Sequence, residues 1–294
     1  MLPDPLRICG ARLLRRATSA RSLSLGPAVR ATVAMVRILL CLVVSLLPLS
    51  SLHAQTLRIA AASDLQFVLP DLTAQYEKQS GAKLAVTYGS SGNFFAQIQN
   101  GAPFDLFFSA DISYPHKLVT SQLADPDSLQ VYAVGRLVLW VPPDSPLDPS
   151  AGFKTLLDPR VQKIAIANPE HAPYGRAAVE ALKNAGFYDQ LQPKLVFGEN
   201  ISQAAQFVQS GSAQAGLLAF SLAVSPALNS GKRWGIPAKQ YPPVEQAVIL
   251  LRASPNKAAA QAFLAFLKSP AARTTFEQYG FFLPPRPTEE KHKL

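Results

Sequence analysis

Cysteine is nearly absent from this sequence. Only two of its 294 residues are cysteines, Cys9 and Cys41, and both lie within the first 54 residues. If those residues are removed as a leader, the remaining chain has no thiol, which excludes a disulfide framework, a cysteine nucleophile and a thiolate metal site. The histidines His116, His171 and His292 show no spacing typical of metal ligands either. We therefore expect no cofactor held by cysteine or histidine.

Long hydrophobic runs are also missing, apart from one short apolar segment at residues 38–49. That segment is too short to span a bilayer comfortably. Seven arginines and one acidic residue share the first 54 residues with it, and the small residue Ala54 ends this region. A charged start, an apolar middle and a small-residue end predict a secretory signal peptide cleaved near Ala54. A membrane anchor at 38–49 is the alternative. Met35 would by itself begin a signal of normal length, so translation of residues 1–34 stays open.

The excess of positive charge depends largely on that leader. The whole chain has 28 basic and 19 acidic residues, a formal net charge of +9. Without the first 54 residues, 21 basic and 18 acidic residues remain, a net charge of +3. This small excess gives little support for a nucleic-acid-binding surface. We expect no nucleic acid as a partner.

After residue 55 the pattern alternates between strands and helices. Short apolar runs bounded by polar residues predict strands, and segments of helical periodicity lie between them. This βαβαβα order predicts a parallel, doubly wound sheet, and a second block repeats it. We expect strands at 56–62, 83–88, 105–109, 163–167, 194–197, 215–220 and 245–251, and helices at 64–79, 93–99, 113–122, 174–184, 201–209, 256–268 and 270–279.

Two strand-like stretches, near 131–138 and 243–249, are candidate crossovers between these blocks. Two lobes joined by two crossovers form a hinged clamp around a ligand. The sequence therefore predicts an α/β fold of two doubly wound lobes joined by two crossover strands. We expect a leader at 1–54, a first lobe at 55–135 and 247–294, and a second lobe at 136–246.

Four short segments lead from a predicted strand into a predicted helix and contain no Lys or Arg. Ligands of doubly wound sheets sit at the carboxyl ends of strands. Helix N-termini there present free N–H groups with partial positive charge, so several of them can bind an anion without a cationic side chain. Each segment alone is more often a helix cap or a loop. Together, two per lobe, they predict an anion site at 61–64, 89–93, 171–175 and 198–201.

The sequence resembles the periplasmic molybdate-binding proteins of ABC transporters from about Leu57 to Phe281. The resemblance rests on a set of motifs in a fixed order along the chain. They are Ala60-Ala-Ala-Ser63, the Ser90-Ser91 pair, Gly101-Ala-Pro-Phe-Asp105, Gly135-Arg-Leu-Val-Leu-Trp140, His171-Ala-Pro-Tyr-Gly175, Gly198-Glu-Asn-Ile-Ser-Gln203 and Tyr279-Gly-Phe281.

The resemblance implies a periplasmic-binding-protein-like fold of type II and a periplasmic location. The family captures molybdate or tungstate and delivers it to the membrane permease of an ABC importer. It implies a monomer without catalysis or cofactor. By motif position, the hydroxyls of Ser63 and Ser91 and the backbone N–H groups of Tyr174 and Ile201 would bind the oxyanion. Some members add a tyrosine hydroxyl from a segment in which this chain has Ala219, so that donor is missing here.

Other interpretations of the residues stay open. Sulfate or another tetrahedral oxyanion would suit the same donors, whereas hydrogenphosphate would need an acceptor, so we expect it to be rejected. An enzyme on the same scaffold is the other alternative. A serine hydrolase would need a base near Ser63 or Ser91, but Gly89-Ser-Ser-Gly92 is not the GxSxG motif and no histidine stands in an obvious partner motif. Asp105 and Asp111 could form a carboxylate pair, and Arg176 could reach the anion.

Overall fold

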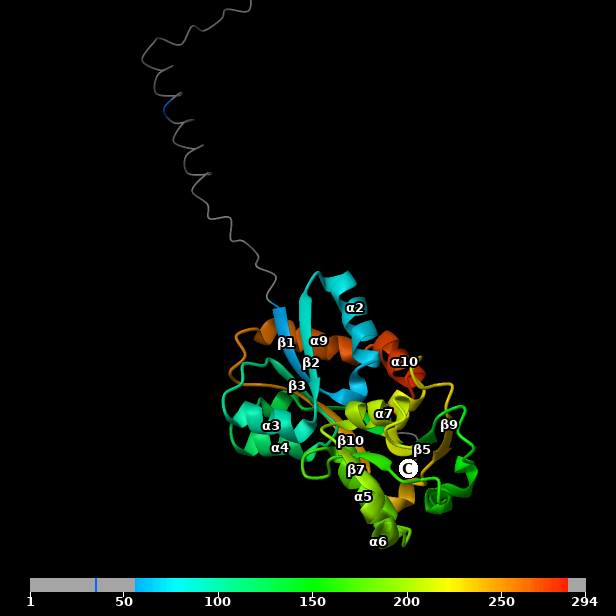
Figure 1. Cartoon of the computed structure of the whole chain (residues 1–294). Coiled ribbons are helices and arrows are strands. Elements are labelled where there is room, and N and C mark those ends of the chain that lie inside the picture. Colours follow the sequence, from blue (N-terminus) through cyan, green and yellow to red (C-terminus); the bar gives the residue numbers. More distant parts are fainter. Residues whose placement is uncertain (1–34, 36–55, 285–294) are drawn as a thin grey trace, which may run out of the picture. The chain divides into compact units, whose positions relative to one another are not determined.

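The computed structural model describes Met35 and residues 56–284 (Figure 1). The predicted signal peptide and cleavage point, and the tail at 285–294, lie outside the described residues. Among the residues described, no helix is long and apolar enough to cross a membrane. The described strands form two five-stranded sheets, one in each of two α/β lobes, as predicted.

The first sheet has the strand order β2-β1-β3-β10-β4. Its parallel part is β1 (Thr56–Ala62), β2 (Lys83–Gly89) and β3 (Leu106–Ser109). Of the other two strands, β10 (Val244–Leu250) breaks the predicted parallel arrangement, because it runs antiparallel to both of its neighbours, β3 and β4 (Gln130–Gly135). The reason is that β10 enters this sheet on the return of the chain from the second lobe.

The second sheet has the order β7-β6-β8-β5-β9. β6 (Ile164–Ala167) runs parallel to β7 (Leu195–Gly198) and β8 (Ala215–Ala219), and β5 (Leu137–Val141) runs antiparallel to β8. The sequence pattern did not reveal the edge strand β9 (Lys232–Gly235), since its short charged segment lacks an apolar run. Such short, charged strands are typical of sheet edges.

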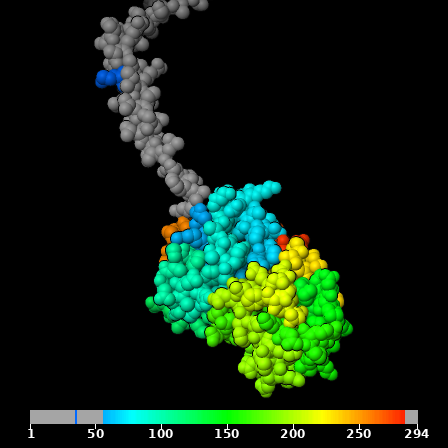
Figure 2. Space-filling view, viewed as in Figure 1, coloured from blue at the N-terminus to red at the C-terminus, as the bar shows by residue number. Residues whose placement is uncertain are grey.

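Two crossovers connect the lobes. The first is the direct step from β4 to β5 through Arg136, and the second is β10, in agreement with the two predicted stretches. In the space-filling view, the first lobe (blue to cyan) lies against the second (green to yellow) (Figure 2).

The helices fall close to their predicted positions, with one shift in the first. Instead of one helix at 64–79, a 3-10 turn (Ser63–Leu65) precedes α2 (Val68–Ser80). Pro70 explains the shift, because a proline is tolerated in the first turn of a helix but clashes with the preceding turn in its interior. The other α-helices are α3 (Ser91–Gln99), α4 (Ser113–Thr120), α5 (Pro173–Asn184), α6 (Tyr188–Leu191), α7 (Ile201–Gln209), α8 (Phe220–Ala223), α9 (Lys257–Leu267) and α10 (Pro270–Gln278).

Hydrophobic packing holds each lobe together. Helices α2, α9 and α10 cover one face of the first sheet, and α3 and α4 cover the other face. The second sheet has a larger core with α5, α7 and α8.

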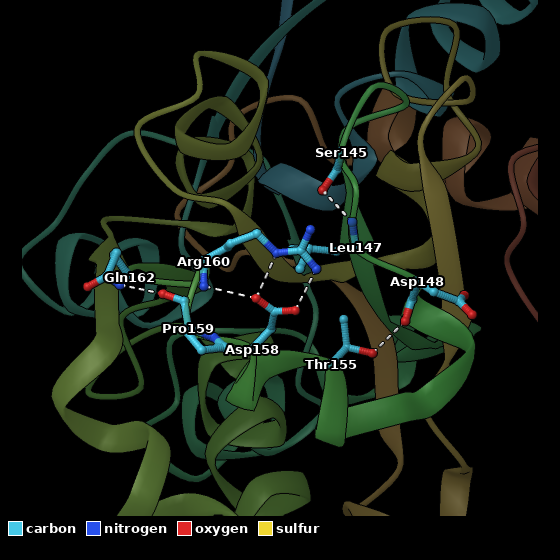
Figure 3. Close-up of polar contacts among 8 residues, drawn as sticks. All are labelled: Ser145, Leu147, Asp148, Thr155, Asp158, Pro159, Arg160 and Gln162. Carbon is cyan, nitrogen blue, oxygen red and sulfur yellow. Dashed lines mark hydrogen bonds and ion pairs between the residues drawn. The ribbon is translucent and has the colours of Figure 1, made fainter.

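The connection between β5 and β6 packs Phe153, Leu156 and Val161 into the core of the second lobe, and polar contacts fix its turns (Figure 3). The hydroxyl of Thr155 donates to the carbonyl oxygen of Asp148 at 2.6 Å, and Arg160 Nη2 bonds Asp158 Oδ2 at 2.6 Å. These bonds from Arg160 lower the pKa of Asp158 to about 2. None of these residues lines the candidate site described next.

Candidate functional site

One small pocket between the lobes brings together all four residues predicted to bind the anion. Ser63 and Ser91 follow strands β1 and β2 of the first lobe. Tyr174 and Ile201 begin helices α5 and α7 of the second lobe. The rest of the lining is small or polar: Ala62, Asp64, Gly89, Ser90, Ala110, Ala172, Pro173 and Asn200.

The two predicted serines do not act as helix caps. The cap of α3 is Ser90, whose Oγ accepts from the N–H of Asn93 at 3.3 Å, while Ser91 is the first residue of the helix itself. Ser63 begins a 3-10 turn whose cap position is held by Ala62. The wholly buried Ser91 Oγ accepts from the N–H of Ala110 at 2.9 Å, which leaves its own proton available to donate.

The other two predicted donors are backbone groups at helix starts, where the first N–H groups have no partner within the helix. Pro173 opens α5, so the N–H of Tyr174 is the first one that this helix offers. In α7, Asn200 Oδ1 accepts from Ser202 and Gln203 at 3.0 and 3.1 Å, which leaves the N–H of Ile201. Within residues 56–284, neither the Tyr174 nor the Ile201 N–H donates a hydrogen bond.

Positive charge does not come from basic side chains here, since no Lys or Arg belongs to the lining. Arg176 lies beside a neighbouring groove, where its Nη2 pairs with Asp111 Oδ2 at 2.6 Å. The supposed carboxylate pair is absent as well. Asp105 is buried and accepts from the backbone N–H of Arg58 at 2.7 Å and from Ser254 Oγ at 2.7 Å, which is a structural role.

The sequence pattern missed a buried polar network beside the pocket. Tyr174 Oη donates to Asp64 Oδ2 at 3.0 Å, and Gln246 Nε2 donates to the same oxygen at 2.5 Å. Tyr132 Oη donates to Gln246 Oε1 at 2.8 Å. Burial raises the pKa of Asp64 to about 6, against the lowering effect of these hydrogen bonds. Asp64 follows Ser63 directly, and its only sequence signal was that of a helix-opening acid.

Several hydrogen bonds cross between the lobes around the pocket. The N–H of Gly92 donates to the carbonyl of His171 at 2.9 Å, and Ser90 Oγ lies 2.9 Å from His171 Nδ1. On another side, Ser202 Oγ donates to the carbonyl of Ser63 at 2.9 Å. The lobes therefore meet on more than one side of the pocket. Ala219, where some relatives have tyrosine, is buried at the end of β8 and outside the lining.

No group of three or more His, Cys, Asp or Glu side chains that could hold a metal ion occurs in the described part of the chain. The pocket offers four hydrogen-bond donors. The two hydroxyls come from the first lobe, and the two free N–H groups come from the second lobe. Hydrogen-bond donors that converge on a buried point, at helix starts with partial positive charge, suit an oxyanion.

Comparison with known proteins agrees with this chemistry. The sequence matches the bacterial extracellular solute-binding protein family over residues 57–282. It is 39% identical over 234 residues to the molybdate-binding protein ModA of Rhodobacter capsulatus, which covers 79% of this chain and 90% of that protein. It is 36% identical to the molybdate-binding protein ModA of Azotobacter vinelandii, over 79% of this chain and 91% of the relative.

The fold of this chain also resembles that of a solved structure. The solved periplasmic molybdate-binding protein of Azotobacter vinelandii superimposes with a TM-score of 0.74 at 35% sequence identity, over 78% of this chain and 100% of that one. This likeness confirms the predicted periplasmic-binding-protein-like fold of two α/β lobes.

Proposed function

The chain belongs to the bacterial extracellular solute-binding proteins, and from that membership and the pocket between its lobes we propose that it captures molybdate, or tungstate, for an ABC importer. The protein would act as a monomer in the periplasm, deliver the anion to a membrane permease, and carry out no chemistry on it. Two relatives at 36–39% identity are molybdate-binding proteins, which supports this choice of ligand.

The observation that carries the proposal is a buried pocket whose donors are neutral and come from both lobes. Ser63 and Ser91 supply hydroxyls, and Tyr174 and Ile201 supply backbone N–H groups. Hydrogen bonds to a charged group contribute about 1.5–3 kcal/mol each. A handful of them, strengthened where water is excluded, offset the cost of desolvating a dianion.

The same geometry supports closure of the lobes on the ligand. We propose that the lobe at 55–135 and 247–294 moves against the lobe at 136–246 about the two crossover strands. Because two donors lie on each lobe, the anion binds the closed form better than an open one. A ligand shifts such an equilibrium only through this difference in affinity.

We expect the selectivity among oxyanions to depend on two features, namely the hydrogen-bond donors of the pocket and the size of the anion. Hydrogenphosphate needs an acceptor for its proton. Asp64 is an acceptor on the lining: its Oδ2 already accepts two bonds, whereas its Oδ1 is buried without a hydrogen-bond partner, so rejection of phosphate requires that this oxygen stays out of reach of the ligand. Sulfate is also a tetrahedral dianion, and it is the alternative ligand. It is smaller than molybdate, so its bonds to fixed donors would be longer and weaker.

The test is calorimetric titration of the mature protein with molybdate, tungstate, sulfate and phosphate, combined with thermal unfolding. We expect tight binding of molybdate and tungstate, weaker binding of sulfate and none of phosphate. At a thousandfold excess of ligand over Kd, stabilisation should reach about 4 kcal/mol. A melting temperature unchanged by saturating molybdate and tungstate would contradict the proposal, and a preference for sulfate would establish the alternative.

A further inference from the structure

The hydroxyl of Tyr174 extends out of the second lobe into a small polar site formed by Asp64 and Gln246, called the socket below. Tyr174 belongs to α5 of the second lobe, and only 2% of its surface is exposed. Its Oη lies 3.0 Å from Asp64 Oδ2 and 3.0 Å from Gln246 Nε2. Asp64 follows β1 of the first sheet, and Gln246 lies in the crossover strand β10. The side chain therefore bridges the two lobes at the crossover.

A glycine makes room for this hydroxyl. Gly135 ends β4, directly before the crossover into β5. A Cβ added at Gly135 would lie 2.1 Å from Tyr174 Oη and 2.9 Å from Gln246 Nε2. Any side chain at position 135 would therefore collide with the hydroxyl unless the tyrosine moved.

The socket is itself held in place. Tyr132 Oη, from β4, donates to Gln246 Oε1 at 2.8 Å, so the amide of Gln246 is oriented with its Nε2 toward Asp64 and Tyr174. Ser221 Oγ, from α8, donates to the backbone carbonyl of Asp64 at 3.0 Å. The carboxyl that accepts the tyrosine hydroxyl is thus fixed from both lobes.

From this geometry we propose that Tyr174 is a positioning residue whose side chain latches the lobes closed while its own backbone N–H is presented to the oxyanion. The inference rests on the proposed function. Anchoring the ring by its hydroxyl fixes the first turn of α5, which carries that N–H. Opening the lobes withdraws the hydroxyl from Asp64 and Gln246, so latch and anion favour the same closed state. Two contacts that favour one state are coupled through it.

The direct test is Tyr174→Phe, which removes the hydroxyl and keeps the ring and the backbone N–H. We expect the Kd for molybdate to rise about ten- to a hundredfold, as for a lost hydrogen bond to a charged or strongly polar partner. We also expect a smaller molybdate-induced change in the distance between spin labels placed on the two lobes. A residue with only a structural role would leave that distance change intact.

Tyr241→Phe is the matched control. Tyr241 is another buried tyrosine that does not belong to the pocket lining, and its Oη accepts from the backbone N–H of Leu137 at 3.0 Å rather than bonding Asp64 or Gln246. Its loss should lower the stability of the protein and leave the Kd for molybdate unchanged.

Gly135→Ala tests the same contact independently, since the added methyl group displaces the Tyr174 hydroxyl while the hydroxyl itself, Asp64 and Gln246 are all retained. It should raise the Kd for molybdate in the wild-type background and have a smaller effect in the Tyr174→Phe background, where the nearest atom is gone. It also carries the test if Tyr174→Phe does not fold.

The outcomes separate the two proposals. Wild-type protein that binds none of the oxyanions contradicts the proposed function. Wild-type protein that binds molybdate, together with an unchanged Kd and an unchanged lobe closure in Tyr174→Phe and in Gly135→Ala, overturns the latch alone.

Discussion

The backbone N–H of Gly92, at the start of α3 in the first lobe, donates a hydrogen bond of 2.9 Å to the carbonyl oxygen of His171 in the second lobe. The two backbones approach so closely that a Cβ added at Gly92 would lie 2.5 Å from that oxygen and 2.8 Å from the Cα of His171. Because both atoms belong to backbone, neither can move aside by a change of rotamer. The observed contact between the lobes therefore requires glycine at this position.

Gly92→Ala should hold the lobes apart and weaken molybdate binding at least tenfold, since overpacking typically costs about 1–3 kcal/mol. Isothermal titration calorimetry measures the affinity, and thermal unfolding without ligand checks that the variant folds. Gly235→Ala is the control, because a Cβ there meets no atom within 4 Å. An affinity equal to that of the wild type would mean that closure does not bring these two backbones together.

Ser63→Ala and Ser91→Ala should each raise the Kd for molybdate about ten- to a hundredfold, because each removes a hydroxyl donor to a buried charge. Ser91→Ala should also lower stability more than Ser63→Ala, because the N–H of Ala110 loses its acceptor. Calorimetry and urea unfolding separate the two effects.

Ser269→Ala serves as the cap control for both serines. Ser269 caps α10, and its Oγ accepts from the N–H of Ala272 at 3.2 Å. This variant should lose about 1 kcal/mol of stability with no change in affinity. If Ser63→Ala and Ser91→Ala behave like Ser269→Ala, the two serines are structural and the site has been assigned wrongly.

The buried carboxyl of Asp64 should make stability depend on pH. Its pKa is raised from 3.8 to about 6 by burial, so the folded protein holds this proton more tightly than the unfolded chain does. Its contribution is therefore fully present below about pH 4 and is lost as the pH rises through about 6. A shift of this size corresponds to about 3 kcal/mol.

Asp64→Asn should remove that loss, so the variant gains stability relative to the wild type between pH 4 and pH 7.5. Urea unfolding of both proteins at several pH values, in a buffer without oxyanions, measures the difference. Parallel pH profiles for the two proteins would show that Asp64 keeps an ordinary pKa in the fold.

The exported protein should begin near Gln55. The arginines, the apolar run at 38–49 and the small residue Ala54 together form the pattern of a cleaved signal peptide. Intact-mass measurement of protein purified from the periplasm determines the N-terminus. A mass that retains residues 38–49 would support the membrane anchor instead.

Local signals explain how much of the fold was predictable. Helix α7 begins at Ile201 and ends at Gln209, as its capping residue Asn200 and its apolar periodicity indicate. The four segments of the candidate site were found in the same way, because a strand end that leads into a helix is a feature of adjacent residues, whereas the choice of the Tyr174 and Ile201 N–H groups within them came from the family resemblance. In a doubly wound sheet, such features collect at one edge.

The same reasoning failed where the deciding contact is distant. The direction of β10 in the first sheet depends on the chain's return from the second lobe, which no local pattern contains.

By itself, the sequence determined the order of strands and helices and the two-lobed class of fold, and it proposed Ser63 and Ser91 as neutral donors, because neighbouring residues encode these features. Only the tertiary structure decided the role of Asp64. Its carboxyl meets Tyr174 and Gln246, which lie 110 and 182 residues further along the chain. The physical reason is that burial and hydrogen bonding of a side chain depend on every segment that packs around it, and here those segments come from both lobes.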